Sequence, residues 1–509
     1  MKKLLALIMV MALLLVCFVA CGNSSTEQND NNSEKESLTN STDSNSTSST
    51  TDKTEAKESS NGLQFELNAA KTGYTLIGIG TCTDTDIIVA YHDGLPVMHI
   101  GSQSFKGNET IKSVTILEPV KNIYTSAFEE CKNLTTVKIG KTVSNIAESA
   151  FRKCEALTTV TIESTVLETI DNYAFMSSPN ITDINIPSSI KYIGTNAFDG
   201  CNALKTYDYG NAKYLGNSAN NYLYLRKAAS FDITEVTIHE STKIIGSSAF
   251  VLCGSLKSIT VPDSVELIGM YAFDHCSSLT EVKIGNNVKQ IEDFAFSNNE
   301  KLTTVTLPSS LEEIGSQFSY APALVGKTYE GVIYLGNPSN EYLYLLRPTS
   351  TDIKNLTLHK DTQIIASDAF EKCEKLETAT LNDGLKIIGY GAFKDCPALK
   401  SINIPSSVKS IEAHSFENCK ALSEIALPDG ITELFSYLFK GCSSLKKISI
   451  PNTIKYIAYD VFNECSSLET ITFRGTAEEW TKIQKYGTWQ DNTPEYTVKC
   501  TDKDVNKNG

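Results

Sequence analysis

The chain has 509 residues and a formal net charge of −15, with 60 acidic and 45 basic side chains. This excess of negative charge argues against a protein that binds nucleic acid, whose footprint would be a basic patch. Six histidines, none in a close cluster, and the absence of a C-x-x-C pair give no sign of a metal or cofactor site.

Residues 1–21 are typical of an export signal, because two lysines precede an uncharged apolar run over Leu4–Val19. Residues 18–21, FVAC, resemble a bacterial lipobox, with a small residue before the cysteine. The segment therefore predicts a lipoprotein signal peptide, lipidated at Cys21, that holds the protein outside the cell membrane. An ordinary signal peptide or a retained membrane anchor is the alternative.

Residues 22–61 are almost entirely Ser, Thr, Asn, Asp, Glu and Lys. Such a stretch cannot bury enough apolar surface to offset its ordering entropy, so it predicts a disordered tether. Residues 62–100 are different, since short apolar runs alternate with polar residues as in strands. They depart from the repeat that follows and predict an N-terminal cap, which hides one end of a repeat core.

A repeat fills residues 101–473, and the stretch Leu256–Ser278 shows it most clearly. Its Leu256, Ile259 and Val261 predict a short strand with one buried face, which Pro262 ends. A phenylalanine, Phe273, then returns a large ring to the core. The same phenylalanine recurs in steps of 22 to 24 residues, with two steps of 52, at Phe105, Phe128, Phe151, Phe175, Phe198, Phe250, Phe273, Phe296, Phe318, Phe370, Phe393, Phe416, Phe439 and Phe462.

This repeat resembles the leucine-rich repeats of the BspA-like family of bacterial surface proteins. As in that class, a cysteine such as Cys276 precedes the L-x-x-L-x-L strand by three residues. The fold class expected is a repeat solenoid, with about 14 coils of about 23 residues, parallel strands stacked in one sheet, and turns or short helical segments opposite. The resemblance implies adhesion to host or neighbouring-cell surfaces.

Two insertions interrupt the repeat at about residues 210–231 and 330–351, and they lie 120 residues apart in the sequence. Each has strand-like runs around a Gly-Asn turn and predicts a hairpin. Ten of the 22 tyrosines lie in or beside these two insertions, within residues 207–224 and 320–344. Tyrosine suits binding surfaces, although the rings could instead pack the hairpin onto the coil beneath. The hairpins thus offer Tyr222, Tyr224, Tyr342 and Tyr344 as candidate ligand contacts.

Residues 474–509 predict a C-terminal cap and tail. Thr476 followed by Glu479 is a capping-box pattern, which favours a short helix up to Lys485. Both tryptophans of the chain, Trp480 and Trp489, lie here, and a tail of this kind resembles the family's C-terminal cap.

Ten cysteines sit three residues after a repeat phenylalanine. Stacked coils lie close enough for disulfides, but equivalent side chains point the same way, which is poor disulfide geometry. Asn, Ser or Ala takes the position in other coils, which favours unpaired structural thiols. The ten are Cys131, Cys154, Cys201, Cys253, Cys276, Cys373, Cys396, Cys419, Cys442 and Cys465.

The strands also predict a long polar face, rich in threonine, as a second possible recognition surface. No nucleophile motif accompanies it, so we expect no enzyme. The function expected is a lipid-anchored, extracytoplasmic protein that binds a protein or glycan partner and no nucleic acid. The alternative is a scaffold or solute-binding lipoprotein with no adhesive role.

Overall fold

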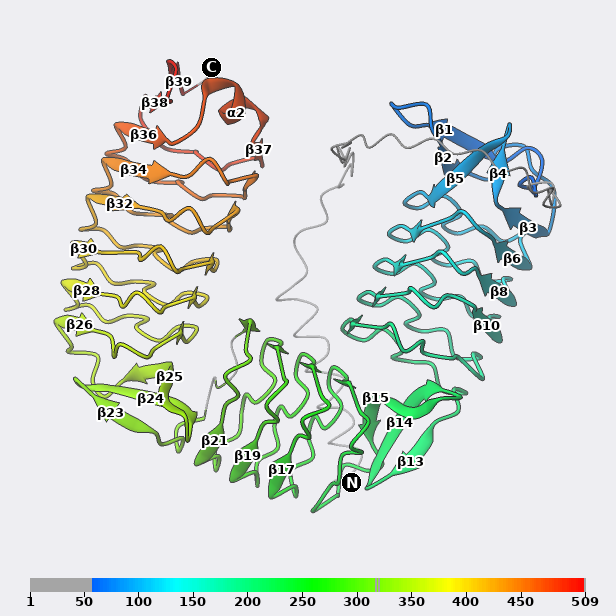
Figure 1. Cartoon of the computed structure of the whole chain (residues 1–509), viewed down its shortest axis with the longest axis horizontal. Helices are drawn as coiled ribbons and strands as arrows, with labels where there is room; N and C mark the ends of the chain where they lie inside the picture. Colours follow the sequence, from blue (N-terminus) through cyan, green and yellow to red (C-terminus); the bar gives the residue numbers. More distant parts are fainter. Residues whose placement is uncertain (1–56, 316–317, 319–320, 508–509) are drawn as a thin grey trace, which may run out of the picture. The chain divides into compact units, whose positions relative to one another are not determined.

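A computed structural model of the chain describes residues 57–507, except residues 316, 317, 319 and 320 (Figure 1). The chain divides into two units, Met1–Glu55 and Ala56–Gly509. The described residues all belong to the second unit. The signal peptide, Cys21 and residues 22–56 of the expected tether lie outside them.

Each regular coil contributes two short strands, where the sequence predicts one. In the coil that begins at Leu256, β17 (Ser258–Thr260) buries Ile259, and β18 (Leu267–Ile268) follows after the turn at Pro262. Both strands pair in parallel with their equivalents in the next coil, β19 (Glu281–Lys283) and β20 (Gln290–Ile291). The solenoid therefore has two strand ladders in place of the expected single sheet.

The first ladder carries the longer strands. Its members are β3 (Asp86–Val89), β6 (Ser113–Ile116), β8 (Thr136–Ile139) and β10 (Thr159–Ile162); then β17, β19 and β21 (Thr304–Thr306); then β26 (Asn355–Thr357), β28 (Thr378–Thr380) and β30 (Ser401–Ile402); and finally β32 (Glu424–Ala426), β34 (Lys447–Ile450), β36 (Thr470–Phe473) and β38 (Thr497–Lys499). The stacked order of these strands can be followed in Figure 1.

The second ladder consists mostly of two-residue strands. Its members are β2 (Tyr74–Gly78), β5 (Leu95–Ile100), β7 (Asn122–Ile123), β9 (Asn145–Ile146), β11 (Thr169–Ile170) and β12 (Tyr192–Ile193); then β16 (Ile244–Ile245), β18, β20 and β22 (Glu313–Ile314); then β27 (Ile364–Ile365), β29 (Ile387–Ile388) and β31 (Ser410–Ile411); and finally β33 (Glu433–Leu434), β35 (Tyr456–Ile457) and β37 (Gln484–Lys485).

The two insertions are antiparallel hairpins, as expected, and they are built into the solenoid. The first has β13 (Tyr207–Tyr209), β14 (Ala212–Asn217) and β15 (Asn220–Ala228); the second has β23 (Lys327–Tyr329), β24 (Val332–Asn337) and β25 (Asn340–Pro348). Strand β15 pairs in parallel with β16, and β25 pairs in parallel with β27. Each hairpin therefore takes the place of a coil in the second ladder.

Counting the hairpins and caps, the fold has about 18 turns of about 23 residues, and the expected 14 is too low. The sequence count followed the repeat phenylalanine, which the hairpins and end turns lack. The leucine-rich-repeat solenoid itself is confirmed.

The repeat phenylalanines form stacks of rings inside the runs of regular coils. Phe128 and Phe151 are fully buried, with ring centroids 5.1 Å apart and planes inclined by 2°. The stack breaks at each hairpin, where Tyr224 packs edge-on against Phe198 at 6.1 Å. Close packing of this kind explains why every coil repeats the same large residue.

Each coil turns around its phenylalanine through residues with positive φ. In the coil of Phe273, these are Tyr271 (φ 57°) and His275 (φ 56°), two positions before and after the ring. Glycine would be the usual choice for such a backbone, but most coils place other residues there. These left-handed turns therefore could not be predicted from the residue types.

The caps close both ends of the array. At the N-terminus, β1 (Gln64–Leu67) pairs antiparallel with β2, and β4 (Tyr91–His92) pairs with β5. Residues 58–60 bond to β3 and β4, through Ser59 N–H to Tyr91 O (2.7 Å) and Ser60 N–H to Ile88 O (2.9 Å), so residues before 62 also contact the cap.

At the C-terminus, the predicted helix is α2 (Ala477–Lys482), and its capping box of Thr476 and Glu479 is present. Trp489 packs edge-on against Phe462, with ring centroids 6.1 Å apart, at the end of the phenylalanine stack. Strand β39 (Asp504–Asn506) then pairs antiparallel with β38. Among the described residues, no helix has the length and apolarity needed to span a lipid bilayer.

Candidate binding surface

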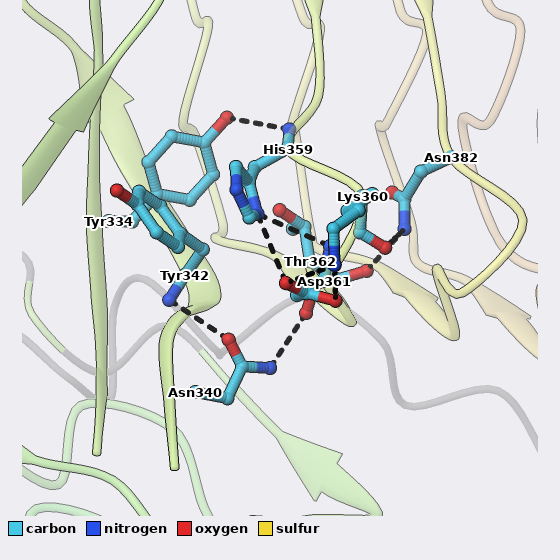
Figure 2. Close-up of polar contacts among 8 residues, drawn as sticks. All are labelled: Tyr334, Asn340, Tyr342, His359, Lys360, Asp361, Thr362 and Asn382. Carbon is cyan, nitrogen blue, oxygen red and sulfur yellow. Dashed lines mark hydrogen bonds and ion pairs between the residues drawn. The ribbon is translucent and has the colours of Figure 1, made fainter. Parts of the chain in front are cut away.

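An aromatic cluster lies on the second hairpin. The rings of Tyr342 (β25) and His359 stack at 3.7 Å with planes inclined by 20°, and Tyr329 (β23) meets the imidazole edge-on at 5.0 Å (Figure 2 shows Tyr342 and His359). Beneath them Tyr334 is fully buried, and its hydroxyl accepts the His359 backbone N–H at 3.4 Å. Burial raises the pKa of Tyr334 to about 12, so this phenol stays neutral.

The hairpin turn is held by asparagine side chains. Asn340 Nδ2 donates to the Asp361 carbonyl (2.8 Å), and its Oδ1 accepts the Tyr342 N–H (3.0 Å) (Figure 2). Asn337 Nδ2 reaches back to the Leu307 carbonyl at 2.8 Å. The turn is thereby fixed to the coils on both sides, which orients Tyr342.

The first hairpin repeats this geometry 120 residues earlier in the sequence. Tyr222 and His239 stack at 4.1 Å and 16°, and Tyr209 meets the imidazole at 4.8 Å. The buried Tyr214 hydroxyl accepts the His239 backbone N–H at 3.3 Å, as its counterpart does. Asn217 repeats the bond to the preceding coil, donating to the Ile186 carbonyl at 2.7 Å.

The histidine turn fixes the imidazole tautomer. His239 Nδ1 accepts the Ser241 N–H at 3.1 Å, and His359 Nδ1 accepts the Asp361 N–H at 3.3 Å. A nitrogen that accepts a backbone N–H carries no proton, so each ring bears its proton on Nε2 in this arrangement. The matched histidines are thus part of the duplicated frame. Their shared place after a strand was the sequence signal, and their stacking on tyrosine was not predicted.

The four candidate contact tyrosines occupy two different environments. Tyr222 and Tyr342 are half-buried in the clusters and keep part of their surface exposed. Tyr224 and Tyr344 are 4 % and 1 % exposed and pack into the ring stack, where burial raises the pKa of both phenols. The last two are core residues, which corrects the sequence hypothesis for them, because a buried ring cannot reach a partner.

The polar strand face is present, and threonines just before its strands join successive coils. Thr135 Oγ1 donates to the Lys112 carbonyl at 2.9 Å, and Thr303 Oγ1 donates to the Thr280 carbonyl at 3.1 Å. The donor protons of these exposed hydroxyls are thus used between coils.

One shallow hollow of about 240 Å³ lies on this face. Its lining residues are Thr158, Thr159, Val160, Thr161, Thr182, Asp183 and Asn185. It forms where the ladder splays after β10, and the Asn185 amide replaces backbone pairing by bonding Ile162 N (3.2 Å) and O (2.9 Å). No aromatic ring lines it, so it lacks the anchor that the hairpins offer.

The ten repeat cysteines are free thiols in the described structure. In most coils the Sγ donates to the carbonyl of the phenylalanine one coil earlier, as from Cys419 to Phe393 O at 3.2 Å. Ser178 and Asn299 make the same bond with their own side chains. Their interchange with cysteine is therefore explained by a shared need for a small buried donor.

Groups of histidine, cysteine and carboxylate that could hold a metal ion do not occur among the described residues. The titratable groups of the hairpins serve stacking and turn bonds. The arrangement offers aromatic surface on a rigid frame, which suits binding.

The pattern of the BspA type leucine rich repeat region matches residues 97–226, 228–327 and 349–469. More than half of the chain is covered, and the chain belongs to this family. The leucine-rich-repeat class, whose members bind proteins or other ligands, is the class that this fold and surface define. A comparison with curated proteins gives no match.

Solved structures give similar chains at low identity. A leucine-rich cell surface protein of Faecalibacterium prausnitzii is 26 % identical, with a TM-score of 0.32, covering 86 % of this chain and 99 % of the other. A leucine-rich repeat protein of Bacteroides ovatus is 22 % identical, with a TM-score of 0.28 and coverage of 86 % and 98 %. The pneumococcal vaccine antigen PcpA is 18 % identical, with a TM-score of 0.29 and coverage of 88 % and 99 %.

Proposed function

We propose that the chain is an extracytoplasmic lipoprotein, anchored through Cys21, whose array binds a protein on host or neighbouring cells. The observation that carries the proposal is the duplicated aromatic cluster, held in one geometry by two hairpins of a leucine-rich-repeat array. Each cluster keeps part of its ring surface exposed above a fully buried tyrosine, although the phenylalanine stack already fills the core of the regular coils. Family membership supports a role in interaction with other proteins.

The anchor is supported by the leader sequence, in which a basic start and an apolar run precede the small residue before Cys21. The polar stretch of residues 22–56 supports a tether between anchor and array. Together they would display the array away from the membrane, where another cell's surface protein can reach it.

The anchor is tested by fractionating cells that make the full chain or its Cys21→Ala variant. We expect the native chain in the membrane fraction with a mature start at residue 21, and release or misprocessing of the variant. An unchanged membrane fraction with a mature start elsewhere would contradict lipidation.

The binding role is tested with residues 57–509, labelled and applied to intact host and neighbouring bacterial cells. We expect saturable binding that protease treatment of the target cells abolishes. Binding that resists protease but is lost after glycosidase treatment would point to a glycan instead. Absence of saturable binding to any surface would favour the scaffold or solute-binding reading.

A further inference from the structure

The two hairpins can be compared with each other, because they share one backbone arrangement and differ in their exposed side chains. The buried tyrosines, the stacked histidine and the asparagine turns agree between the copies within a few tenths of an ångström. Residues that differ between the two hairpins are therefore not required for this shared backbone arrangement. A large exposed apolar residue kept in one copy and replaced in the other calls for an explanation beyond folding.

The first hairpin exposes three large rings. Tyr207 is 45 % exposed, Tyr209 is 41 % exposed and Phe231 is 62 % exposed. At the positions 120 residues later, Tyr207 is matched by Lys327 and Phe231 by Thr351. The second copy has thus replaced two of the three rings with polar residues.

The charges around the two copies differ in the same way. In the second copy three carboxylates have lysine partners: Glu341 pairs with Lys327 at 3.2 Å, Asp352 with Lys375 at 2.7 Å, and Asp361 with Lys360 at 3.0 Å. The first copy exposes three carboxylates, and within the described structure none of them has an ion pair: Asp232, Glu235 and Glu240.

The rings and carboxylates of the first copy lie on segments that meet at the β13–β14 turn, where Ala229 N–H also bonds the Asn211 carbonyl at 2.8 Å. The β13–β14 turn bonds the segment that carries the acids, through Asn211 Nδ2 to the Glu235 carbonyl (3.0 Å) and Thr237 N–H to the Gly210 carbonyl (3.0 Å). Tyr209 contacts the ring of His239, and Glu240 is the next residue along the chain. We call the residues Tyr207, Tyr209, Phe231, Asp232, Glu235 and Glu240 the first-hairpin face.

We infer that the first-hairpin face docks a cationic segment of a protein, one that presents arginine or lysine side chains. A guanidinium or ammonium group over a tyrosine ring gains cation–π energy while its charge pairs with a neighbouring carboxylate. The apolar stems of arginine and lysine also cover exposed rings. The second hairpin lacks two of these rings, and its Asp352 and Asp361 already pair with lysines, so it offers a cationic segment no matching face. The inference rests on the proposed protein-binding function and names the partner chemistry.

The test uses a nona-arginine peptide as probe and isothermal titration of residues 57–509. The test variant carries the second copy's residues in the first hairpin: Tyr207→Lys, Phe231→Thr and Glu235→Asn. These residues already occur on the same frame, so the fold should persist. The control, Glu300→Gln with Glu424→Gln, raises the net charge by the same two units at exposed acids elsewhere.

We expect the test variant to bind the peptide at least about tenfold more weakly and the control to change less than about threefold. An equal loss in both variants would show that bulk charge drives binding and would overturn the inference. Full affinity in the test variant would overturn it as well.

A reciprocal variant guards against loss through local misfolding. Lys327→Tyr, Thr351→Phe and Asn355→Glu install the first-copy residues on the second hairpin, and we expect a second peptide site, seen as doubled stoichiometry. Unchanged stoichiometry would count against the inference. The cell-binding test is independent: failure there contradicts the proposed function, whereas failure of these titrations contradicts only the assigned face and partner chemistry.

Discussion

Tyr222 stacks on His239 with ring centroids 4.1 Å apart, and the imidazole in turn accepts the backbone N–H of Ser241. The stacked pair thus links hairpin strand β15 to the coil that follows it. Tyr342 and His359 repeat the relationship in the second hairpin. The pair is therefore a joint between hairpin and solenoid, and it sets the position of the exposed rings beside it.

The joint predicts coupling between its two rings. In a double-mutant cycle of Tyr222→Ala and His239→Ala, we expect a coupling free energy of about 0.5–1.5 kcal/mol, as for other aromatic pairs. Denaturant unfolding of residues 57–509 measures it. A control cycle pairs His239→Ala with Tyr459→Ala, a distant exposed ring, and should be additive. Additivity in the first cycle would show that the stacking is incidental.

The phenylalanine stack predicts a large cost for removing one ring. Phe393 is fully buried between Phe370 and Phe416, at 5.3 and 5.7 Å. Phe393→Ala should lower the unfolding free energy by about 3–5 kcal/mol, because the ring's contacts are lost and a cavity remains. Thr380→Ala, on the exposed strand face, should change it by less than about 0.5 kcal/mol. Similar effects of the two substitutions would contradict the stack as the main core element.

The buried thiols predict slow alkylation in the folded protein. Burial raises the pKa of Cys131 and Cys396 to about 12 and that of Cys201 to about 11, so almost no thiolate forms at pH 8. With iodoacetamide at pH 8, residues 57–509 should react first at the half-buried Cys82 and Cys500. Mass spectrometry identifies which cysteines have been alkylated.

Raising the pH to 9 should not open the repeat thiols to reagent, because their pKa values lie two units or more higher. After denaturation, all twelve cysteines of this segment should react. Repeat cysteines recovered as disulfide pairs under non-reducing conditions would contradict the free-thiol ladder.

The hairpin turns predict that asparagine is needed at their start. Asn217 bonds the preceding coil and accepts two backbone N–H groups of its own turn, from Ala219 (2.9 Å) and Asn220 (3.0 Å). Asn217→Ala should therefore cost about 1–3 kcal/mol, since the buried Ile186 carbonyl and two N–H groups of the turn lose their bonds. Ser218→Gly, at the exposed tip, is the matched control and should be nearly neutral. Equal stability of the two variants would show that the turn tolerates replacement.

The regular coils could be read from sequence because their large residues recur at fixed spacing. Periodicity placed Phe273 in the core, and the capping box placed α2 within a few residues. The second ladder could not be read, because a two-residue strand such as β18 shows no alternation. The turns at Tyr271 and His275 were hidden for a related reason, since left-handed positions without glycine leave no compositional mark.

The candidate site was half predictable. The high density of tyrosine identified the hairpins. Whether each ring is buried or exposed depends on irregular strand pairing within them. Register shifts occur between Lys213 and Tyr214 and between Leu215 and Asn217, so simple alternation fails along β14. Gly216 follows from the same irregularity, because a Cβ there would lie 2.0 Å from the Asn220 carbonyl. These shifts separate buried Tyr224 from half-buried Tyr222, a distinction that depends on the folded strand.

The central claim, that a protein partner docks on the first hairpin, is tested most directly by site-specific photo-cross-linking. Residues 57–509 would carry benzoylphenylalanine in place of Tyr209 in one protein and in place of its counterpart Tyr329 in another, and each would be irradiated on intact target cells. The account predicts one protein adduct at position 209, suppressed by excess unlabelled array, and little at position 329. Equal adducts at the two positions, or an adduct confined to a strand-face position such as Thr306, would contradict it.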